Sequence, residues 1–276
     1  MPEAWRASFP ASRLPRGKGA LVRRQIVWAA LLRKEWCEQR WRFFLGTIVL
    51  SGLLAGLLRA QIISSLEAEV LIYGLVGLVM VIFFAAGPVA TERADRTWEF
   101  LTVQPVTRSD VILAKWAIGV FQLAATMILA TIAGLLATWS RGFRIMPDLS
   151  ESFASVEAFG TWSTVHPALS LCAFAGVSTL ALACWFTPLF LLLARARNEF
   201  AAALGGLLLT IALLLWSQLG WMAMLNPLAP LVLMFLPHPP VSIPLFLPVD
   251  IALWIVVPLW CTRHKFARLM EKWMGI

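Results

Sequence analysis

The stretch from Val70 to Ala90 contains no charged side chain. About 20 consecutive apolar residues are enough for a helix to cross the hydrocarbon core of a bilayer. The whole chain follows the same trend, because 60% of its 276 residues are hydrophobic and only 14% are charged. A soluble globule of this length could not bury so much apolar surface. We therefore expect an all-α, polytopic integral membrane protein, and the composition excludes a soluble enzyme.

Six stretches of the sequence reach or approach the length of a membrane span. The first ends near Arg59, whose long side chain can reach the membrane surface, and the last is short and contains Asp250. The six predicted transmembrane helices are 43–63, 70–90, 116–139, 168–194, 200–224 and 245–262.

The basic residues indicate how these spans are oriented. Six spans place both termini on one side of the membrane, and 20 of the 23 Lys and Arg residues then fall on that side. The opposite side keeps only Arg59, Arg141 and Arg144. Since Lys and Arg accumulate in cytoplasmic loops, we predict a multi-pass protein of the cell membrane with cytoplasmic N and C termini. The net charge of +8 is then explained by orientation and membrane lipids, and no nucleic acid partner is expected.

The region before the first span divides into two parts. Residues 1–20 are rich in Pro, Arg, Ser and Gly, and we expect a flexible N-terminal leader ahead of one transmembrane domain, 21–276. Residues 21–42 lack Gly and Pro and mix basic residues with Trp36 and Trp41. Such a composition favours an amphipathic interfacial helix on the cytosolic membrane surface. The alternative is a plain basic tail.

The loop 91–110 mixes charged residues with large apolar ones. We expect it to begin as a helical extension of the second span, which Pro105 then ends. Thr107, followed three residues later by an acidic residue, matches a capping box that would start the next helix. Apolar side chains such as Trp98 are costly to leave in water. The loop is therefore predicted to dock on a partner, the alternative being an ordinary solvated loop.

The order of residues in this loop resembles a known family. Glu92-Arg93 is followed by Thr97-Trp98-Glu99-Phe100-Leu101, then by Pro105-Val106-Thr107-Arg108 and Lys115. This order is similar to that of ABC-2 type transporter permeases, the transmembrane subunits of ABC exporters, although Arg96 and Ala114 stand where Gly is common in that family. There the loop forms a coupling helix in a groove of the ATP-binding subunit. The resemblance implies an ATPase-docking set: Glu92, Arg93, Trp98, Glu99, Phe100, Pro105 and Arg108.

The same resemblance implies what the chain does and with whom. It would be the permease subunit of an ATP-driven exporter, forming an efflux pathway with a second permease subunit, identical or different, and coupled to an ATP-binding cassette subunit. The sequence lacks the GxxxxGK[ST] loop that cradles phosphates. We therefore expect no enzymatic activity and no cofactor in this chain, with ATP and Mg²⁺ bound by the partner. His and Cys spacings suggest no metal site.

Two glycine patches would allow helices to approach closely. They are Gly52 with Gly56 in the first span, and Gly205 with Gly206 in the fifth. The resemblance implies that these spans pair two permease subunits, so the four glycines are a candidate dimer seam. The alternative is packing within one chain.

The connection after the fifth span is dense in proline and cannot form one regular helix. Its apolar part is too short to span, which suggests a re-entrant segment over 226–240. By the resemblance this segment is a candidate outer gate that includes Asn226, Pro227 and Pro230. The alternative is a rigid connector.

Two other functions remain open from the residues alone. Asp250 is the only carboxylate inside a predicted span, so it could serve an ion-coupled secondary transporter, or it could simply cap the sixth helix. The second alternative is a non-transporting membrane anchor or regulatory module that acts through the basic N-terminal region.

Overall fold

A computed structural model describes residues 18–60, 68, 70–94, 108–139, 167–193, 199–216, 226–228 and 248–261. Over these ranges the chain is helical except for a turn at 226–228, and no strand occurs in them. The all-α prediction is confirmed for this part of the chain. The elements are α1 (Lys18–Ala60), the π-helix η2 (Val70–Val76), α3 (Gly77–Ala94), α5 (Arg108–Trp139), α7 (Pro167–Leu193), α8 (Glu199–Trp216), the π-helix η5 (Ala252–Val256) and α11 (Val257–Cys261).

Each predicted span falls on one of these helices. Within the described ranges, three helices are long and apolar enough to cross a membrane, namely Trp28–Ala60, Asp110–Trp139 and Leu171–Leu193. Shorter apolar helices cover Leu71–Ala86, Phe200–Trp216 and Pro248–Trp260. The described part of α8 runs to Trp216, and residues 217–225, which include the rest of the predicted fifth span, lie outside the described ranges. The chain is therefore a membrane protein whose apolar helices lie at the positions predicted from hydropathy.

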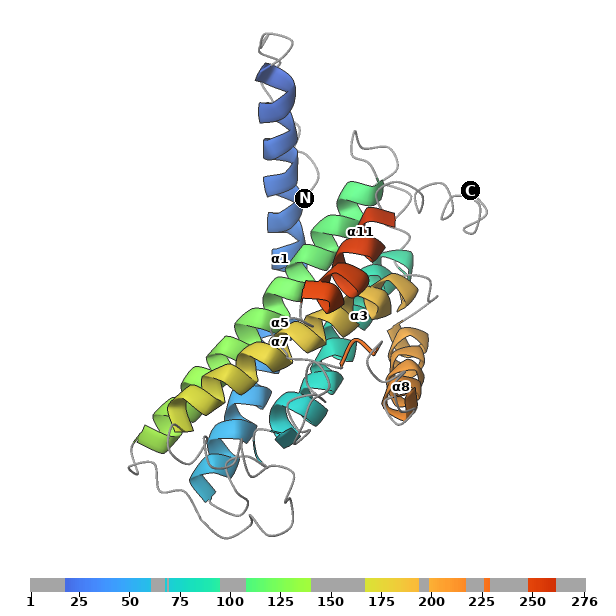
Figure 1. Ribbon diagram of the computed structural model, residues 1–276. Helices are drawn as coiled ribbons and strands as arrows, with labels where there is room; N and C mark the ends of the chain where they lie inside the picture. The colour runs from blue at the N-terminus through green and yellow to red at the C-terminus, as the bar shows by residue number, and fades with distance from the viewer. Residues whose placement is uncertain are drawn as a thin grey trace.

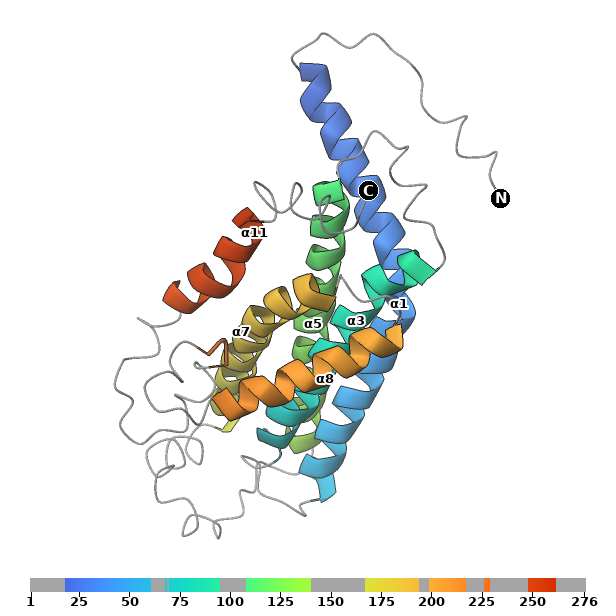
Figure 2. The same cartoon turned by 90° about the vertical axis from the view of Figure 1, so that its right-hand side faces the viewer.

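The helices alternate in direction along the bundle. α1 runs beside α5, and α3 lies between α1, α7 and α8 (Figure 1). Figure 2 shows α8 lying obliquely across α3. The start of α1, the end of α3 and the start of α5 all lie at the upper end of the molecule in both views. We call this end of the bundle the α3–α5 end.

α1 is one continuous helix of 43 residues, so no break marks the boundary predicted at residue 42. At 1.5 Å per residue it is about 65 Å long, roughly twice the hydrocarbon thickness of a bilayer. Its N-terminal part projects beyond the other helices (Figure 1). The prediction that 21–42 is helical is confirmed, while its position at the membrane surface stays a prediction.

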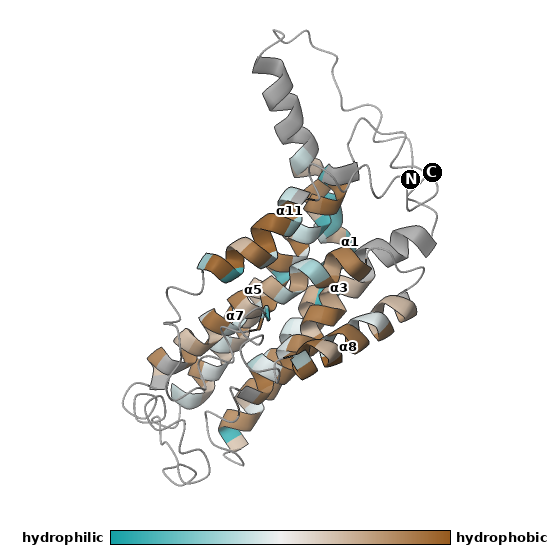
Figure 3. Cartoon of the chain, turned by 45° about the vertical axis from the view of Figure 1, so that its right-hand side comes forward, coloured by the Kyte–Doolittle hydropathy of each residue, from teal (hydrophilic) through white to brown (hydrophobic). Residues whose placement is uncertain are grey.

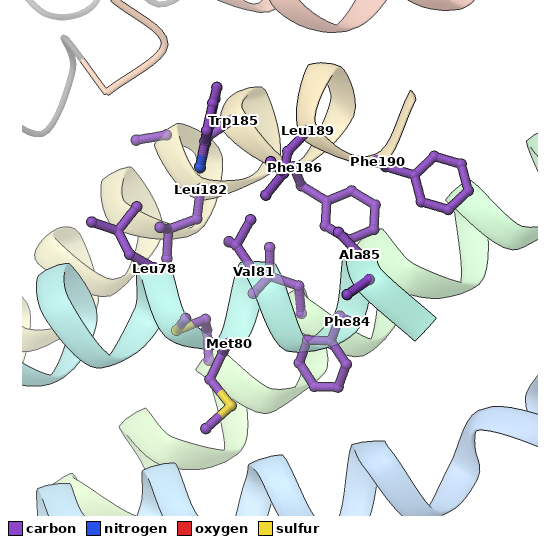
Figure 4. Close-up of a cluster of buried hydrophobic side chains, with 14 of the residues drawn as sticks. Leu78, Met80, Val81, Phe84, Ala85, Leu182, Trp185, Phe186, Leu189 and Phe190 are labelled. Atoms are coloured by element: carbon purple, nitrogen blue, oxygen red, sulfur yellow. The ribbon is translucent and has the colours of Figure 1, made fainter. Parts of the chain in front are cut away.

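Apolar side chains cover the outside of the bundle as well as its core. Ile48 is 69% exposed and Leu136 is 67% exposed, and Figure 3 shows apolar residues along most of the described helices on the side in view. Inside, Leu78 and Val81 of α3 point toward apolar residues of α7 such as Leu182 (Figure 4). An apolar exterior around an apolar core is the arrangement expected for a protein solvated by lipid.

Hydroxyl and indole groups join neighbouring helices within this apolar core. The pairs are Thr47–Thr126 at 3.2 Å, Tyr73–Thr131 at 2.7 Å, Trp116–Thr187 at 3.2 Å and Trp185–Thr210 at 3.3 Å. Hydrogen bonds of this kind replace the missing hydrophobic driving force between helices in lipid. They fix α5 against α1, η2 and α7, and α7 against α8.

Candidate functional site

The predicted docking residues gather at the α3–α5 end where the structure describes them. Glu92 and Arg93 lie in the last turn of α3, which confirms the helical extension of the second span, and Arg108 is the first residue of α5. Thr107, the predicted cap, lies outside the described residues, so its capping role stays a prediction. The remaining members, Trp98, Glu99, Phe100 and Pro105, lie outside the described residues. The loop between the two helices therefore leaves and re-enters the bundle at one end.

A buried ion pair lies just inside this end. Lys115, two turns into α5, places its Nζ 2.7 Å from Glu35 Oε2 on α1, and both side chains are 1% exposed. Gln39 Nε2, also buried, donates to the same oxygen at 3.3 Å. Charged hydrogen bonds are stronger in such surroundings because the dielectric constant is low. The pair therefore ties the start of α5 to the middle of α1.

The Glu35–Lys115 pair can form because the side of α1 that carries Glu35 faces the bundle. Leu31, Glu35, Gln39 and Arg42 are all buried, and their spacing of three to four residues places them on one side of the helix. Trp41, by contrast, is 54% exposed. In the sequence Lys115 stands out only as part of the family resemblance, and Glu35 does not stand out at all. The i, i+4, i+8 spacing of Leu31, Glu35 and Gln39 was the available signal.

Arg42 makes a second connection from the same face of α1. Its Nη1 donates to the carbonyl oxygen of Phe83 on α3 at 3.4 Å. The guanidinium carbon also lies 5.3 Å from the Trp41 ring centroid and 5.7 Å from that of Phe83, within the range of cation–π attraction. α1 is thus joined to both helices that flank the 95–107 loop, to α5 through Glu35 and to α3 through Arg42.

The two glycine patches have different surroundings. A Cβ added at Gly52 or Gly56 would meet no atom within 4 Å, so this side of α1 is open. A Cβ at Gly206 would lie 3.0 Å from Ile82 of α3 and 3.3 Å from Leu193 of α7, while one at Gly205 would lie 3.7 Å from Leu193. Gly206 therefore serves packing within the chain, which was the alternative to the seam, whereas Gly52 and Gly56 leave a surface for a neighbour.

Asn226 of the candidate outer gate is tied to α8. It is fully buried, and its Nδ2 donates to the carbonyl oxygen of Leu213 at 2.9 Å, while its Oδ1 accepts from the Leu228 amide at 2.9 Å. The amide thus satisfies a carbonyl in the last turn of α8 and holds the buried turn that contains Pro227. Pro230 lies outside the described residues. These contacts favour a rigid start to the segment.

Asp250 does not cap the sixth helix. Pro248 and Val249 are already helical, and neither carboxylate oxygen of Asp250 has a hydrogen-bond partner, although the side chain is only 1% exposed. A capping carboxylate would accept a hydrogen bond from a backbone amide of the first turn. The capping interpretation is therefore wrong. Among the described residues, no three His, Cys, Asp or Glu side chains group as metal ligands would.

Comparison with known proteins agrees with this arrangement. A family model described as ABC-2 family transporter protein matches residues 29–262, which include every described helix from the middle of α1 to α11. No curated protein matches the chain.

Proposed function

Because the chain belongs to the ABC-2 transporter family and is thus a membrane transport permease, we propose that it is the membrane-spanning subunit of an ATP-driven exporter. Two permease subunits, identical or different, would form the efflux pathway, and ATP-binding cassette subunits would drive it. The observation that carries the proposal is the family match over 29–262. It is supported by the meeting of α3 and α5 at one end of the bundle, where the family's coupling loop would lie.

The proposed topology has six membrane spans with both termini in the cytoplasm. Twenty of the 23 Lys and Arg residues fall on the cytoplasmic side in this topology, as the positive-inside rule requires. The α3–α5 end would then face the cytoplasm, and the exposed Trp41 side of α1 would contact lipid at the membrane surface. The segment 226–240 would close the pathway from the outside.

The chemistry is divided between subunits in this proposal. The sequence contains no phosphate-binding loop, so ATP and Mg²⁺ would be bound by the partner and this chain would not be an enzyme. Closure of the ATPase pair would move the loop 91–110. The Glu35–Lys115 pair and the Arg42 contacts would carry this movement from α5 and α3 to α1, because a buried ion pair resists separation. The spans would then switch between inward-open and outward-open arrangements.

Charge reversal in the docking set tests this function. Glu92→Lys or Glu99→Lys should lower substrate-stimulated ATPase activity of the reconstituted complex, because a lysine would repel the basic groups that a carboxylate attracts. The measurement is ATP hydrolysis with and without substrate in proteoliposomes. Glu38→Lys is the matched control, since Glu38 lies half-exposed on α1 beside Lys34. Full coupling in the Glu92→Lys/Glu99→Lys double variant would refute the docking role.

The open glycine face of α1 gives a second test. Gly52→Leu with Gly56→Leu should remove most of the permease dimer, because leucines prevent the close approach that two glycines allow. Native mass spectrometry of the purified protein measures the dimer fraction. Gly176→Leu on α7 is the control, because a Cβ there also meets nothing within 4 Å. A dimer that tolerates both leucines would place the seam elsewhere.

The two alternative functions give different results in the same reconstitution. An ion-coupled transporter would move substrate down an ion gradient without any ATP-binding subunit. A non-transporting anchor would show no flux even with that subunit bound. Flux that requires the ATP-binding subunit and ATP separates the proposed function from both.

A further inference from the structure

The helix that carries Asp250 exposes its apolar residues and buries its one carboxylate. From Pro248 to Trp260 every residue but one is exposed or half-exposed, and most are apolar; the one buried residue is Asp250. In a membrane this means that the apolar residues face lipid while the carboxylate faces the other helices. The charge is therefore directed into the bundle.

The carboxylate lies at the level of a span interior. It interacts electrostatically with the thiol of Cys184, which is buried and belongs to the interior of α7 (Pro167–Leu193). Neither oxygen has a partner in hydrogen-bonding geometry. Because a carboxylate in hydrocarbon surroundings is costly, such residues usually face a substrate or ion pathway. A positively charged ligand would neutralise the carboxylate and so remove the free-energy cost of burying it.

Two tryptophan rings meet at the next turn of the same helix. Trp254 follows Asp250 by four residues, and its indole Nε1 is buried without a hydrogen-bond partner. Its ring packs against that of Trp216, at the end of α8, with centroids 6.3 Å apart and an interplanar angle of 73°. This turn lies in the π-helix η5, and single π-helical turns are frequent at functional sites. Indole faces attract cations.

We propose that Asp250, Trp254 and Trp216 form a recognition site for the positively charged group of an amphipathic organic cation, an amine or a quaternary ammonium. The carboxylate would neutralise the charge, the indole rings would cover its alkyl groups, and the apolar spans would hold the lipophilic part. One carboxylate offers too few oxygens to hold a metal ion, whereas carboxylate and aromatic rings together suit an ammonium group. The identification of this ligand as the exported cargo rests on the proposed function. Its binding to the chain does not depend on that function.

Binding to the chain alone tests the proposal. The full chain is purified into nanodiscs of zwitterionic lipid, without an ATP-binding subunit, and binding of radiolabelled tetraphenylphosphonium is measured by equilibrium dialysis. The chain should bind the probe saturably, with triphenylphosphine oxide, a neutral analogue, failing to compete. Asp250→Asn should weaken binding at least about tenfold, as expected when one charged contact is lost. Trp254→Leu should also weaken binding, and Trp254→Phe, which keeps an aromatic face, should retain most of it.

Two matched controls separate recognition from general damage. Asp110→Asn removes a carboxylate in the first turn of α5, and Trp260→Leu removes a 55% exposed indole of the same helix as Asp250. Both should bind like the unaltered chain. The melting temperature of Asp250→Asn should be unchanged or higher, because the substitution removes a carboxylate whose burial is costly. Unchanged binding by Asp250→Asn, or no saturable binding at all, would overturn the proposal while leaving the ATPase coupling test unaffected.

Discussion

Lys115→Met is expected to destabilise the protein by about 3–5 kcal/mol, because it removes the buried ammonium group that pairs with the Glu35 carboxylate. The two charged atoms are 2.7 Å apart and both side chains are 1% exposed, so water cannot replace the lost partner. Thermal unfolding followed by fluorescence-detected size-exclusion chromatography would measure the loss. Replacing both residues, Glu35→Gln with Lys115→Met, should recover much of the stability, since neither charge then remains.

Lys34→Met is the matched control for this experiment. Lys34 Nζ also approaches Glu35, at 3.6 Å, but its side chain is 39% exposed. A partly solvated pair of this kind contributes about 0–1 kcal/mol. Melting temperatures that are equal for Lys115→Met and Lys34→Met would show that the buried pair does not hold α1 to α5.

Gly119→Ala should destabilise the crossing of α5 and α7 by about 1–3 kcal/mol, the usual cost of overpacking a filled core. A Cβ at Gly119 would collide with the ring of Phe186. That ring is fully buried and stacks on Phe190 at 5.7 Å, so it has little room to move aside. The melting temperature in detergent is the measurement. Combining the change with Phe186→Leu should reduce the cost of the alanine, because the shorter side chain leaves space for the methyl group.

Gly176→Ala on α7 is the same chemical change, but we expect it to stabilise the protein slightly. A Cβ there meets nothing within 4 Å, so the only effect is the gain in helix propensity, up to about 1 kcal/mol. The alanine at 176 should therefore raise the melting temperature slightly while the alanine at 119 lowers it. Equal effects at the two positions would contradict the close packing of α5 on α7.

Part of the candidate site could be predicted from local sequence. The helical extension through Glu92 and Arg93 followed from the span before them, and the capping residues after Pro105 predicted a helix that includes Arg108. These are local features, since a helix begins and ends according to residues within a few positions. The Glu35–Lys115 pair was beyond such reasoning, because its two residues are 80 positions apart and nothing local in either helix indicates the other.

The sequence by itself determined that the chain is helical, that it belongs in a membrane and approximately where each apolar helix lies, because hydropathy over about 20 residues sets the energy of crossing a bilayer. Only the tertiary structure decided which side of each helix faces its neighbours. In a bilayer the core and the surroundings are both apolar, so hydrophobicity alone cannot distinguish them. Polar and small residues make that distinction through their burial and their neighbours, which is why the tertiary structure was needed to place Glu35, Gly206 and Asp250.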